Sequence, residues 1–399
     1  MNDGAPTATT DRSQGGQTTL SREAIGRVDT TDQLGDILSL PDHLHDALWR
    51  VESAALPERE TPEGMVVAGM GGSAIGGALA RAALGDQASR PMFVTRVYGL
   101  PTWTTAETTV LCCSYSGNTE ETLACYESAG LLGAQRVVAT TGGRLAEMAR
   151  ADGVPIIPLP GGFQPRAAVA YMTVAALEVA ARCGVGPRMS TEIDVAASHT
   201  EHLVAEWGPD APEASLAKEV ARGIHGSIPV IAGAGLTVPI AYRWKTQINE
   251  NAKQPAFAGE LPELDHNELM GWEGASELGR FSAIFLDDSD AHPRLKTRLE
   301  LTAALIAPTA VANFRLQTRG ETGIERVISL VLLGDLVSLY LAVLRGVDPG
   351  PVLLIERLKQ ELAKQEPPLR CASRATPRGR LTGSARAPLR PAETLTRSW

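Results

Sequence analysis

Three hydroxyl side chains and a glycine lie within the six residues Ser114-Tyr115-Ser116-Gly117-Asn118-Thr119, which we name the hydroxyl loop. The apolar run Thr109–Cys113 before it has the length and the β-branched content of a buried strand, and residues 120–130 after it have helical spacing. Where a helix begins, backbone N–H groups without partners and the positive end of the helix dipole together favour an anion. Gly117 lets the backbone come close to a ligand. The hydroxyl loop is therefore predicted to hold a phosphate group.

A second turn, Gly69-Met70-Gly71-Gly72-Ser73, which we name the glycine turn, follows the short apolar strand Met65–Ala68 and precedes a helix predicted over 73–84. Parallel strands of an open sheet end at one edge, where the loops that follow them converge on a crevice. The two turns should therefore supply hydroxyl and backbone donors to a single phosphate. The hydroxyl groups expected there are those of Ser73, Ser114, Ser116 and Thr119.

Two features of the hydroxyl loop favour other interpretations. Serine, threonine and asparagine are common helix caps, and Asn118 and Glu121 have the spacing of a capping box. Glu120 and Glu121 would also repel an anion unless they point sideways. For one loop alone the helix cap would be the better interpretation, but two glycine-hydroxyl loops after two strands favour phosphate.

The glycine turn also fits the dinucleotide-binding pattern G-x-G-x-x-A over residues 69–74. In that reading the next strand should end near an acid that holds a ribose, but it carries Arg96, which only NADP would tolerate. The nucleotide-binding pattern G-x-x-x-x-G-K-[ST] does not occur. A dinucleotide-dependent oxidoreductase remains as an alternative.

The elements that position these turns alternate along the chain. Strands followed by helices indicate parallel βαβ units, so the predicted fold class is α/β with helices on both faces of each sheet. Both halves begin with a strand, a glycine turn and a helix, as a duplicated domain would. The second half has no counterpart of the hydroxyl loop, so phosphate binding is expected mainly in the first. The predicted organisation is a disordered N-terminal tail (1–20), a helical extension (21–60), a first domain (61–188), a connecting helical segment (189–225), a second domain (226–365) and a disordered basic tail (366–399).

Composition narrows the class of protein. The chain has 399 residues and a formal net charge of −9, which argues against a general nucleic-acid binder. Its first residues lack the basic start and apolar core of a signal peptide. The apolar run 327–344 approaches membrane-spanning length, but Asp335 interrupts it, so a buried core helix is predicted. We therefore expect no membrane and no nucleic-acid partner.

Five cysteines occur without CxxC or zinc-like spacing. Cys112 and Cys113 are adjacent in a predicted strand, so their side chains should pack on opposite faces of the sheet. An odd cysteine count in a large chain is typical of a reducing cytoplasm, where we expect this protein.

The order of the motifs resembles a known family. The glycine turn, the hydroxyl loop and Gln164-Pro165-Arg166 resemble the sugar isomerase (SIS) domain. With Asn249-Glu250-Asn251 and Glu263-Leu264-Asp265-His266-Asn267 following in tandem, the chain resembles the bifunctional phosphoglucose/phosphomannose isomerase family over about residues 64–362. The resemblance implies two tandem SIS domains, each a three-layer αβα arrangement. It also implies interconversion of fructose 6-phosphate with glucose 6-phosphate and mannose 6-phosphate, without metal or cofactor.

The resemblance assigns roles that the residues alone do not. It implies that Glu250 is the base that moves a proton between C2 and C1, and that Arg166 stabilises the enediolate. It implies that His266 opens the sugar ring in the pocket of a neighbouring subunit, hence a homodimer, and that Lys359 assists it. It adds Gly72 to the substrate-binding residues. By themselves, Glu250 is typical of an ion-paired helix-end acid, His266 of a surface histidine and Lys359 of an amphipathic helix.

A departure from the family pattern occurs at Asp348-Pro349-Gly350-Pro351, where glycine replaces a threonine that is frequent there. If this position shapes the surroundings of the sugar C2, the preference between the glucose and mannose epimers depends on it. An alternative from another functional class is a sugar-phosphate sensor that keeps the hydroxyl loop and uses the basic tail for a partner. A sensor has no need of Glu250 and His266 together.

Overall fold

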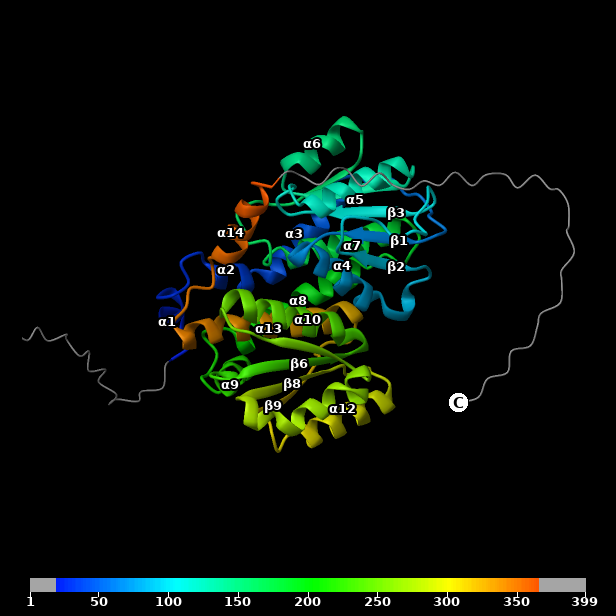
Figure 1. The fold of residues 1–399 in the computed structure, drawn as a ribbon. Coiled ribbons are helices and arrows are strands. Elements are labelled where there is room, and N and C mark those ends of the chain that lie inside the picture. The colour runs from blue at the N-terminus through cyan, green and yellow to red at the C-terminus, as the bar shows by residue number, and fades with distance from the viewer. Residues whose placement is uncertain (1–18, 366–399) are drawn as a thin grey trace, which may run out of the picture. The chain divides into compact units, whose positions relative to one another are not determined.

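The computed structural model describes residues 19–365 (Figure 1). The basic tail predicted at 366–399, and all but the last two residues of the tail predicted at 1–20, lie outside the described residues. Leu20 is buried, so the packed chain begins one residue before the predicted extension. The chain divides into two compact units, one ending at Pro351 and the other beginning at Val352.

The first sheet consists of five parallel strands in the order β2-β1-β3-β4-β5. β1 lies between β2 and β3, so Ala68 is flanked by Thr95 and Cys112 at the carboxyl edge. This arrangement brings the turns after β1 and β3 to one edge, as the sequence predicts. The strands are β1 (Met65–Ala68), β2 (Met92–Thr95), β3 (Thr109–Cys113), β4 (Gln135–Thr140) and β5 (Ile156–Pro158).

Helices cover both faces of this sheet. α4 (Gly71–Leu84) and α7 (Val169–Arg182) pack on the inner face, whereas α5 (Glu120–Leu131) and α6 (Gly143–Ala151) cover the outer face. Cys113 belongs to the inner core and Cys112 to the outer one. The prediction that these adjacent cysteines pack on opposite faces is confirmed.

The second sheet has four parallel strands in the order β7-β6-β8-β9. The strands are β6 (Ile228–Ala234), β7 (Phe257–Leu261), β8 (Phe281–Asp287) and β9 (Ala312–Gln317). The sequence did not predict β7, because this edge strand buries only Leu261 and contains Gly259 and Glu260, which are uncommon in strands. The α/β fold class with two parallel sheets is confirmed.

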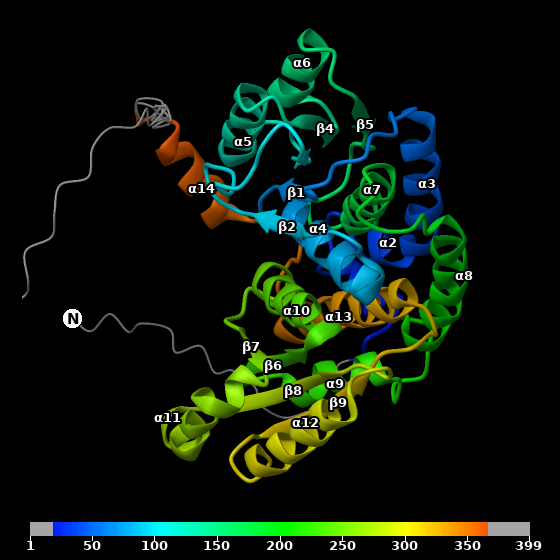
Figure 2. The ribbon, with the colours of Figure 1, turned by 90° about the vertical axis from the view of Figure 1, so that its right-hand side faces the viewer.

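Four helices lie between the two sheets, and their side chains form one continuous core with the inner faces of both (Figures 1 and 2). They are α4 and α7 from the first half, and α10 (Val238–Asn251) and α13 (Gly323–Arg345) from the second. The outer face of the second sheet is covered by α12 (Pro293–Ile306) and α11 (Ala275–Leu278). The carboxyl end of α10 is thereby held against the first half of the chain.

Among the described residues, one helix, α13, is long and apolar enough to cross a membrane by length and composition. However, 94% of its most apolar stretch is buried inside the structure. It packs against α4, α10 and two connecting helices, α8 (Ser190–Trp207) and α9 (Leu216–Ile224). The predicted buried core helix is confirmed.

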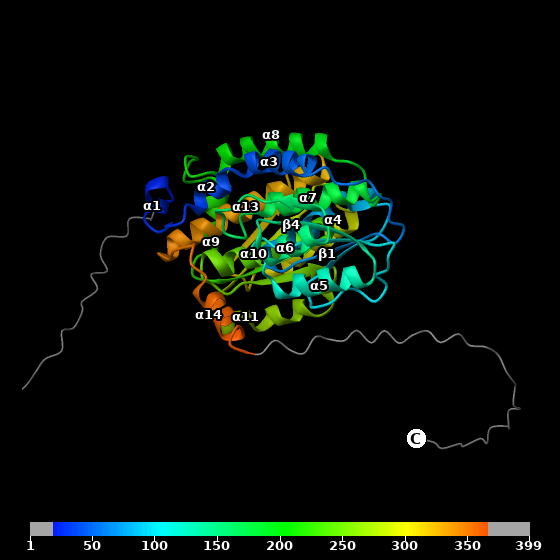
Figure 3. The same cartoon turned by 90° about the horizontal axis from the view of Figure 1, so that it is seen from above.

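The N-terminal extension consists of α1 (Arg22–Gly26), α2 (Gln33–Leu38) and α3 (Leu40–Ser53). Pro41 lies in the first turn of α3, a position where its missing N–H costs nothing. α3 packs against α7 and lies beside α8, and α2 packs against α13 (Figures 2 and 3). The extension is thus part of the central core. The unit that begins at Val352 contains α14 (Leu353–Leu362), in which no residue is buried.

Candidate active site

The turns after β1 and β3 contact each other at the carboxyl edge of the first sheet. The backbone N–H of Tyr115 donates to Ser73 Oγ at 3.3 Å, so the glycine turn and the hydroxyl loop are joined directly. Ser114 Oγ lies 2.8 Å from Thr119 Oγ1, and Ser116 Oγ accepts a bond from the N–H of Asn118. Ser73 and Ser114 are buried, whereas Ser116 is exposed. The four hydroxyl groups therefore occupy neighbouring positions, two of them deep and one open to solvent.

Glycine is required at one position of the hydroxyl loop. Gly117 has φ of +69°, and a Cβ there would lie 1.8 Å from the carbonyl oxygen of Gly142. Only glycine fits both the left-handed backbone and this close approach. Gly117 thus holds the loop against the turn between β4 and α6.

The helices that begin at this edge have no side-chain caps. α4 follows Met70 and α5 follows Thr119, and neither residue accepts a hydrogen bond from the first turn of its helix. The capping box considered for Asn118 and Glu121 is wrong, because Asn118 Oδ1 accepts from the backbone N–H of Arg144 instead. First-turn N–H groups without a side-chain acceptor suit an anion.

Glu120, the first of the two glutamates after the loop, is held by a hydrogen bond. Tyr98 donates its hydroxyl to Glu120 Oε2 at 3.1 Å, which turns this carboxylate toward the end of β2. Burial and Glu120 raise the pKa of Tyr98, consistent with a carboxylate held beside it. Glu120 therefore points sideways, as the phosphate hypothesis requires.

Gly72 connects the glycine turn to Arg166. A Cβ at Gly72 would lie 2.7 Å from the carbonyl oxygen of Pro165 and 3.3 Å from the Cα of Arg166. Tyr115 supports the same loop, because its hydroxyl donates to the Pro160 carbonyl and accepts from the N–H of Phe163. The segment that carries Arg166 is thus packed directly against both turns.

The Arg166 side chain is 4% exposed and each of its nitrogens has a partner. Nε donates to Asn251 Oδ1 at 2.8 Å, Nη1 to Glu250 Oε2 at 3.3 Å, and Nη2 to the carbonyl oxygen of Pro349 at 2.7 Å. Nη2 also reaches the Gly350 carbonyl at 3.2 Å. Burial lowers the pKa of Arg166, and Glu250 acts in the opposite direction. The guanidinium is fixed in one orientation in a site largely closed to water.

Glu250 stands at the end of α10 with its side chain 32% exposed. It is ion-paired with Arg166, and solvent also reaches it. The neighbouring Asn251 is buried and donates to Ser338 Oγ, which fixes the end of the helix. Lys253, with a left-handed φ of 52°, donates to the carbonyl oxygens of Glu250 and Pro349. The Glu250 carboxylate, the buried Arg166 guanidinium and the Lys253 ammonium therefore lie together, next to the edge of the first sheet that carries the hydroxyl groups.

Among the described residues, no hydrogen bond or ion pair joins His266 to this cluster. His266 ends a short 3₁₀ turn, Glu263–His266, and its side chain is exposed. That turn is held by Asp265, which accepts from Arg298 and Thr302. Lys359 is exposed in α14, in the unit that begins at Val352. The structure thus brings together Gly72, Ser73, Ser114, Ser116, Thr119, Arg166 and Glu250.

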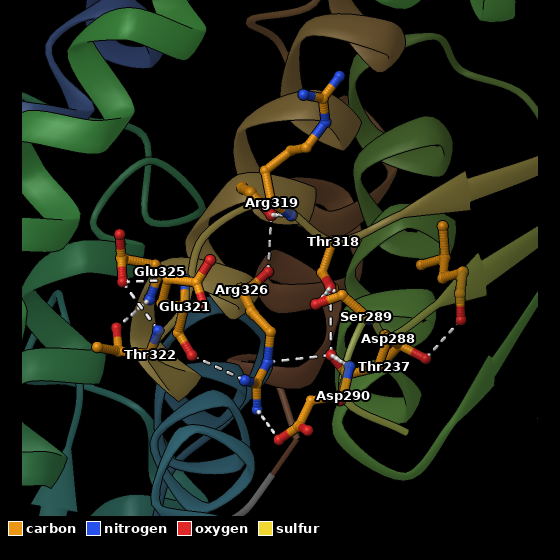
Figure 4. Close-up of polar contacts among 12 residues, drawn as sticks. Thr237, Asp288, Ser289, Asp290, Thr318, Arg319, Glu321, Thr322, Glu325 and Arg326 are labelled. Carbon is orange, nitrogen blue, oxygen red and sulfur yellow. Dashed lines mark hydrogen bonds and ion pairs between the residues drawn. The ribbon is translucent and has the colours of Figure 1, made fainter. Parts of the chain in front are cut away.

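The corresponding edge of the second sheet carries carboxylates (Figure 4). The loop after β8, which matches the hydroxyl loop in the topology, contains Asp288 and Asp290. Both form ion pairs with Arg326, at 3.0 and 3.4 Å, and Thr318 donates to Asp288. The positive charge at this edge is already neutralised by the protein's own acids.

Several residues around the cluster were not predicted. Arg243, 1% exposed, donates to Asp335 Oδ2 at 2.6 Å and to the carbonyl oxygen of Arg166 at 3.1 Å. The signal for this pair is Asp335 itself, because an acid inside an apolar helix requires a buried partner. Gly350 contacts the extension: a Cβ there would lie 2.6 Å from the Thr31 side chain, and Thr30 donates to Asp348.

Two parallel sheets in tandem, covered by helices and with a hydroxyl-lined edge on the first, define an α/β protein of the SIS class. Residues 213–362 match the family described as the bacterial phospho-glucose isomerase C-terminal SIS domain. A solved structure of a hypothetical protein from Thermus thermophilus has the same fold, with a TM-score of 0.65 and 17% identity. The match covers 87% of this chain and 94% of that one.

Two relatives extend the similarity to nearly their whole lengths. The bifunctional phosphoglucose/phosphomannose isomerase of Caldicellulosiruptor bescii is 39% identical over 82% of this chain and 98% of the relative. The enzyme of the same name from Aquifex aeolicus is 38% identical over 76% of this chain and 91% of the relative. The chain belongs to the bifunctional phosphoglucose/phosphomannose isomerase family, and the resemblance drawn from the motifs is confirmed.

Proposed function

We propose that this chain is an aldose–ketose isomerase that interconverts fructose 6-phosphate with glucose 6-phosphate and mannose 6-phosphate. The observation that carries the proposal is the contact of Arg166 with Glu250 next to two uncapped helix starts lined with hydroxyl groups. A sugar phosphate needs an anion site at one end and acid–base chemistry at the other. The names of the relatives support the same substrates.

The phosphate binds at the edge of the first sheet. Ser73, Ser114, Ser116 and Thr119 donate their hydroxyl groups, and the first turns of α4 and α5 donate backbone N–H groups. Gly72 and Gly117 allow these turns to approach one another and the ligand. The second edge is unsuited to the same task because Asp288 and Asp290 already hold Arg326.

The proton transfer takes place at Glu250. In the open-chain aldose this carboxylate removes the proton from C2, the electron pair passes to the carbonyl oxygen, and a cis-enediolate forms. A proton then passes from Glu250 to C1 after partial exchange with solvent, a hydroxyl proton moves from O2 to O1, and the ketose results. Arg166 stabilises the negative oxygen, and its burial strengthens this interaction because little water screens it.

Ring opening is assigned to His266 and Lys359. His266 is exposed on an anchored turn, a placement suited to a pocket of a neighbouring subunit, so the active enzyme is a homodimer. Lys359 acts with it. The domain organisation predicted from the sequence, with phosphate binding in residues 61–188 and acid–base residues in 226–365, belongs to this proposal, as does a cytoplasmic location.

A sugar-phosphate sensor is the second candidate function. The uncapped, hydroxyl-lined edge would serve a sensor equally well. The ion pair of Glu250 with a buried arginine would then be only structural. Catalysis therefore has to be tested apart from binding.

The test is exchange of the C1 proton of fructose 6-phosphate in D2O, followed by NMR, together with conversion to the aldoses. Wild type should exchange and convert the substrate, and Glu250→Gln should lose both by about 10²-fold or more while still binding it. Glu277→Gln, an exposed acid on α11, is the matched control and should keep both. Binding without exchange in wild type would establish the sensor instead.

A further inference from the structure

Lys253 has a backbone conformation that works against stability. α10 ends at Asn251, its C-cap is Ala252, and Lys253 follows with a left-handed φ of 52°. Glycine is the usual residue in this conformation directly after a helix cap, because a Cβ there lies too close to the following carbonyl. A lysine at this place is therefore less favourable for the fold than a glycine would be.

The neighbours of Lys253 hold it in this conformation. Ala252 and Gln254 are both buried. The carbonyl oxygen of Ala252 accepts from Arg345 Nε at 2.8 Å, and that of Gln254 accepts from Asn249 Nδ2 at 2.8 Å. Backbone strain persists where the surrounding structure fixes it in this way, and it is concentrated at functional sites. The strained position thus directs attention to the lysine side chain.

The side chain of Lys253 turns back toward the active-site cluster. Its Nζ donates to the carbonyl oxygen of Glu250 in the last turn of α10, and to the carbonyl oxygen of Pro349 at 3.1 Å. Carbonyl groups in the last turn have no partner inside the helix, and a cation there also suits the helix dipole. Arg166 Nη2 donates to the same Pro349 oxygen at 2.7 Å. One carbonyl oxygen therefore joins Lys253 to Arg166.

Two cations that share one acceptor repel each other. Partial burial and the charge of Arg166 lower the pKa of Lys253, and Asp348 and Glu250 act in the opposite direction. A glycine in place of Lys253 would avoid both this repulsion and the backbone strain. Local features that work against folding are expected where function requires them.

We propose that Lys253 is a positioning residue that links the Glu250 end of α10 to the turn that holds Arg166. The link keeps the Glu250 carboxylate in reach of the guanidinium, to which it is bonded at 3.3 Å. Its catalytic consequence rests on the proposed isomerase function, in which Glu250 moves the proton and Arg166 stabilises the enediolate. The link itself belongs to the folded chain and is measurable without turnover.

The first measurement is kcat and KM for fructose 6-phosphate in three variants. Lys253→Met keeps the strained backbone and loses the ammonium, whereas Lys253→Gly loses both. In each of these variants kcat should fall by about three- to tenfold with KM unchanged. Lys253→Arg keeps the charge and several donors, so its kcat should stay within about twofold of that of wild type.

Two kinetic results would overturn the proposal. A rise in KM alone in Lys253→Met would mean that the ammonium binds the substrate directly. Unchanged kcat and KM in Lys253→Met would mean that the link has no effect on the catalytic residues.

The second measurement is Tm, which separates positioning from a structural role. If the lysine serves the fold, Lys253→Gly should lower Tm together with kcat, and this result overturns the proposal. We expect instead a Tm at or above that of wild type together with a lower kcat. The matched control is Ala55→Gly, because Ala55 is exposed and also follows a helix cap with a left-handed φ of 46°. This control should gain stability and leave kcat unchanged.

The third measurement tests the link without turnover. In protein made with isotope-labelled arginine, the NMR signal of the Arg166 Nε–H group is the one lost in Arg166→Lys. Nε donates to the buried Asn251, so this hydrogen should exchange slowly with solvent in wild type and at least about threefold faster in Lys253→Met. Unchanged exchange in Lys253→Met overturns the proposal even if the chain is not an isomerase. Faster exchange in Lys253→Met, with no C1 exchange of fructose 6-phosphate in wild type, would support the link and reject the isomerase.

Discussion

Replacement of Arg166 by lysine should separate positioning from charge. The guanidinium donates toward three sides: to Asn251, to Glu250 and to the carbonyl oxygens of the 349–350 turn. A lysine keeps the charge but has a single nitrogen, so it cannot reach all three. Asn251 is fully buried, and loss of its donor costs about 1–3 kcal/mol. Displacement of the positive charge proposed to lie beside the enediolate should cost about as much as loss of one oxyanion-hole donor, about 2.7–4 kcal/mol, which is about 10²- to 10³-fold in kcat.

The assay is steady-state isomerisation of fructose 6-phosphate, with kcat and KM determined separately. Because the proposal assigns the phosphate to other residues, KM of Arg166→Lys should stay close to that of wild type while kcat falls. Arg144→Lys, a conservative change at an exposed arginine near the same edge, is the matched control and should leave both constants unchanged. A normal kcat in Arg166→Lys, or a loss carried by KM alone, would refute the assignment of Arg166 to the transition state.

Two further predictions concern the hydroxyl loop. Ser116→Ala removes a hydroxyl donor to a charged group, worth about 1.5–3 kcal/mol, so KM should rise roughly ten- to hundredfold before kcat changes. The control is Ser128→Ala in α5, whose hydroxyl donates to the Ala124 carbonyl oxygen, and this variant should be neutral. A drop in proton exchange in Ser116→Ala with normal substrate binding would contradict the phosphate role. Gly117→Ala places a Cβ on the Gly142 carbonyl at a left-handed φ, so it should lower the free energy of unfolding by more than the about 1–2 kcal/mol of backbone strain and raise KM. Gly153→Ala has the same backbone strain with open space around it, and equal destabilisation of the two variants in urea would show that the contact with Gly142 is unimportant.

Hydrophobic periodicity and turn chemistry predicted most of the fold. β1 and β3 have the predicted bounds, because buried parallel strands carry strong local patterns. The edge strand β7 was missed because most of its residues are not buried, so no apolar pattern marks it. The bounds of α8 inside the connecting segment were not predicted either. Its apolar residues pack against both α3 and α13 and are separated by many polar positions, so no single apolar stripe marks the helix.

The candidate site was predictable where the signal is local. Glycine with hydroxyl residues between a strand and a helix marks an anion edge from sequence alone, and the contact of Ser73 with Tyr115 agrees with the predicted convergence of the two turns. Asp335 in an apolar helix indicates a buried partner, but the pairing with Arg243 was not predictable, because the two residues are 92 residues apart and their contact depends on how α10 and α13 pack.

The structure also explains why a duplicated fold would act as a single site. At the first edge, hydroxyl groups and uncapped helix starts leave positive potential for a ligand. At the second edge, Asp288 and Asp290 neutralise the positive charge of Arg326 through ion pairs. The second half contributes instead through α10, whose end carries Glu250 to Arg166. That junction is closed from behind by the N-terminal extension, through the contacts of Thr30 with Asp348 and of Thr31 with Gly350. Because the Gly350 carbonyl also accepts from Arg166, we expect a change in the extension to shift Arg166 and Glu250, the proposed catalytic pair, without touching either residue.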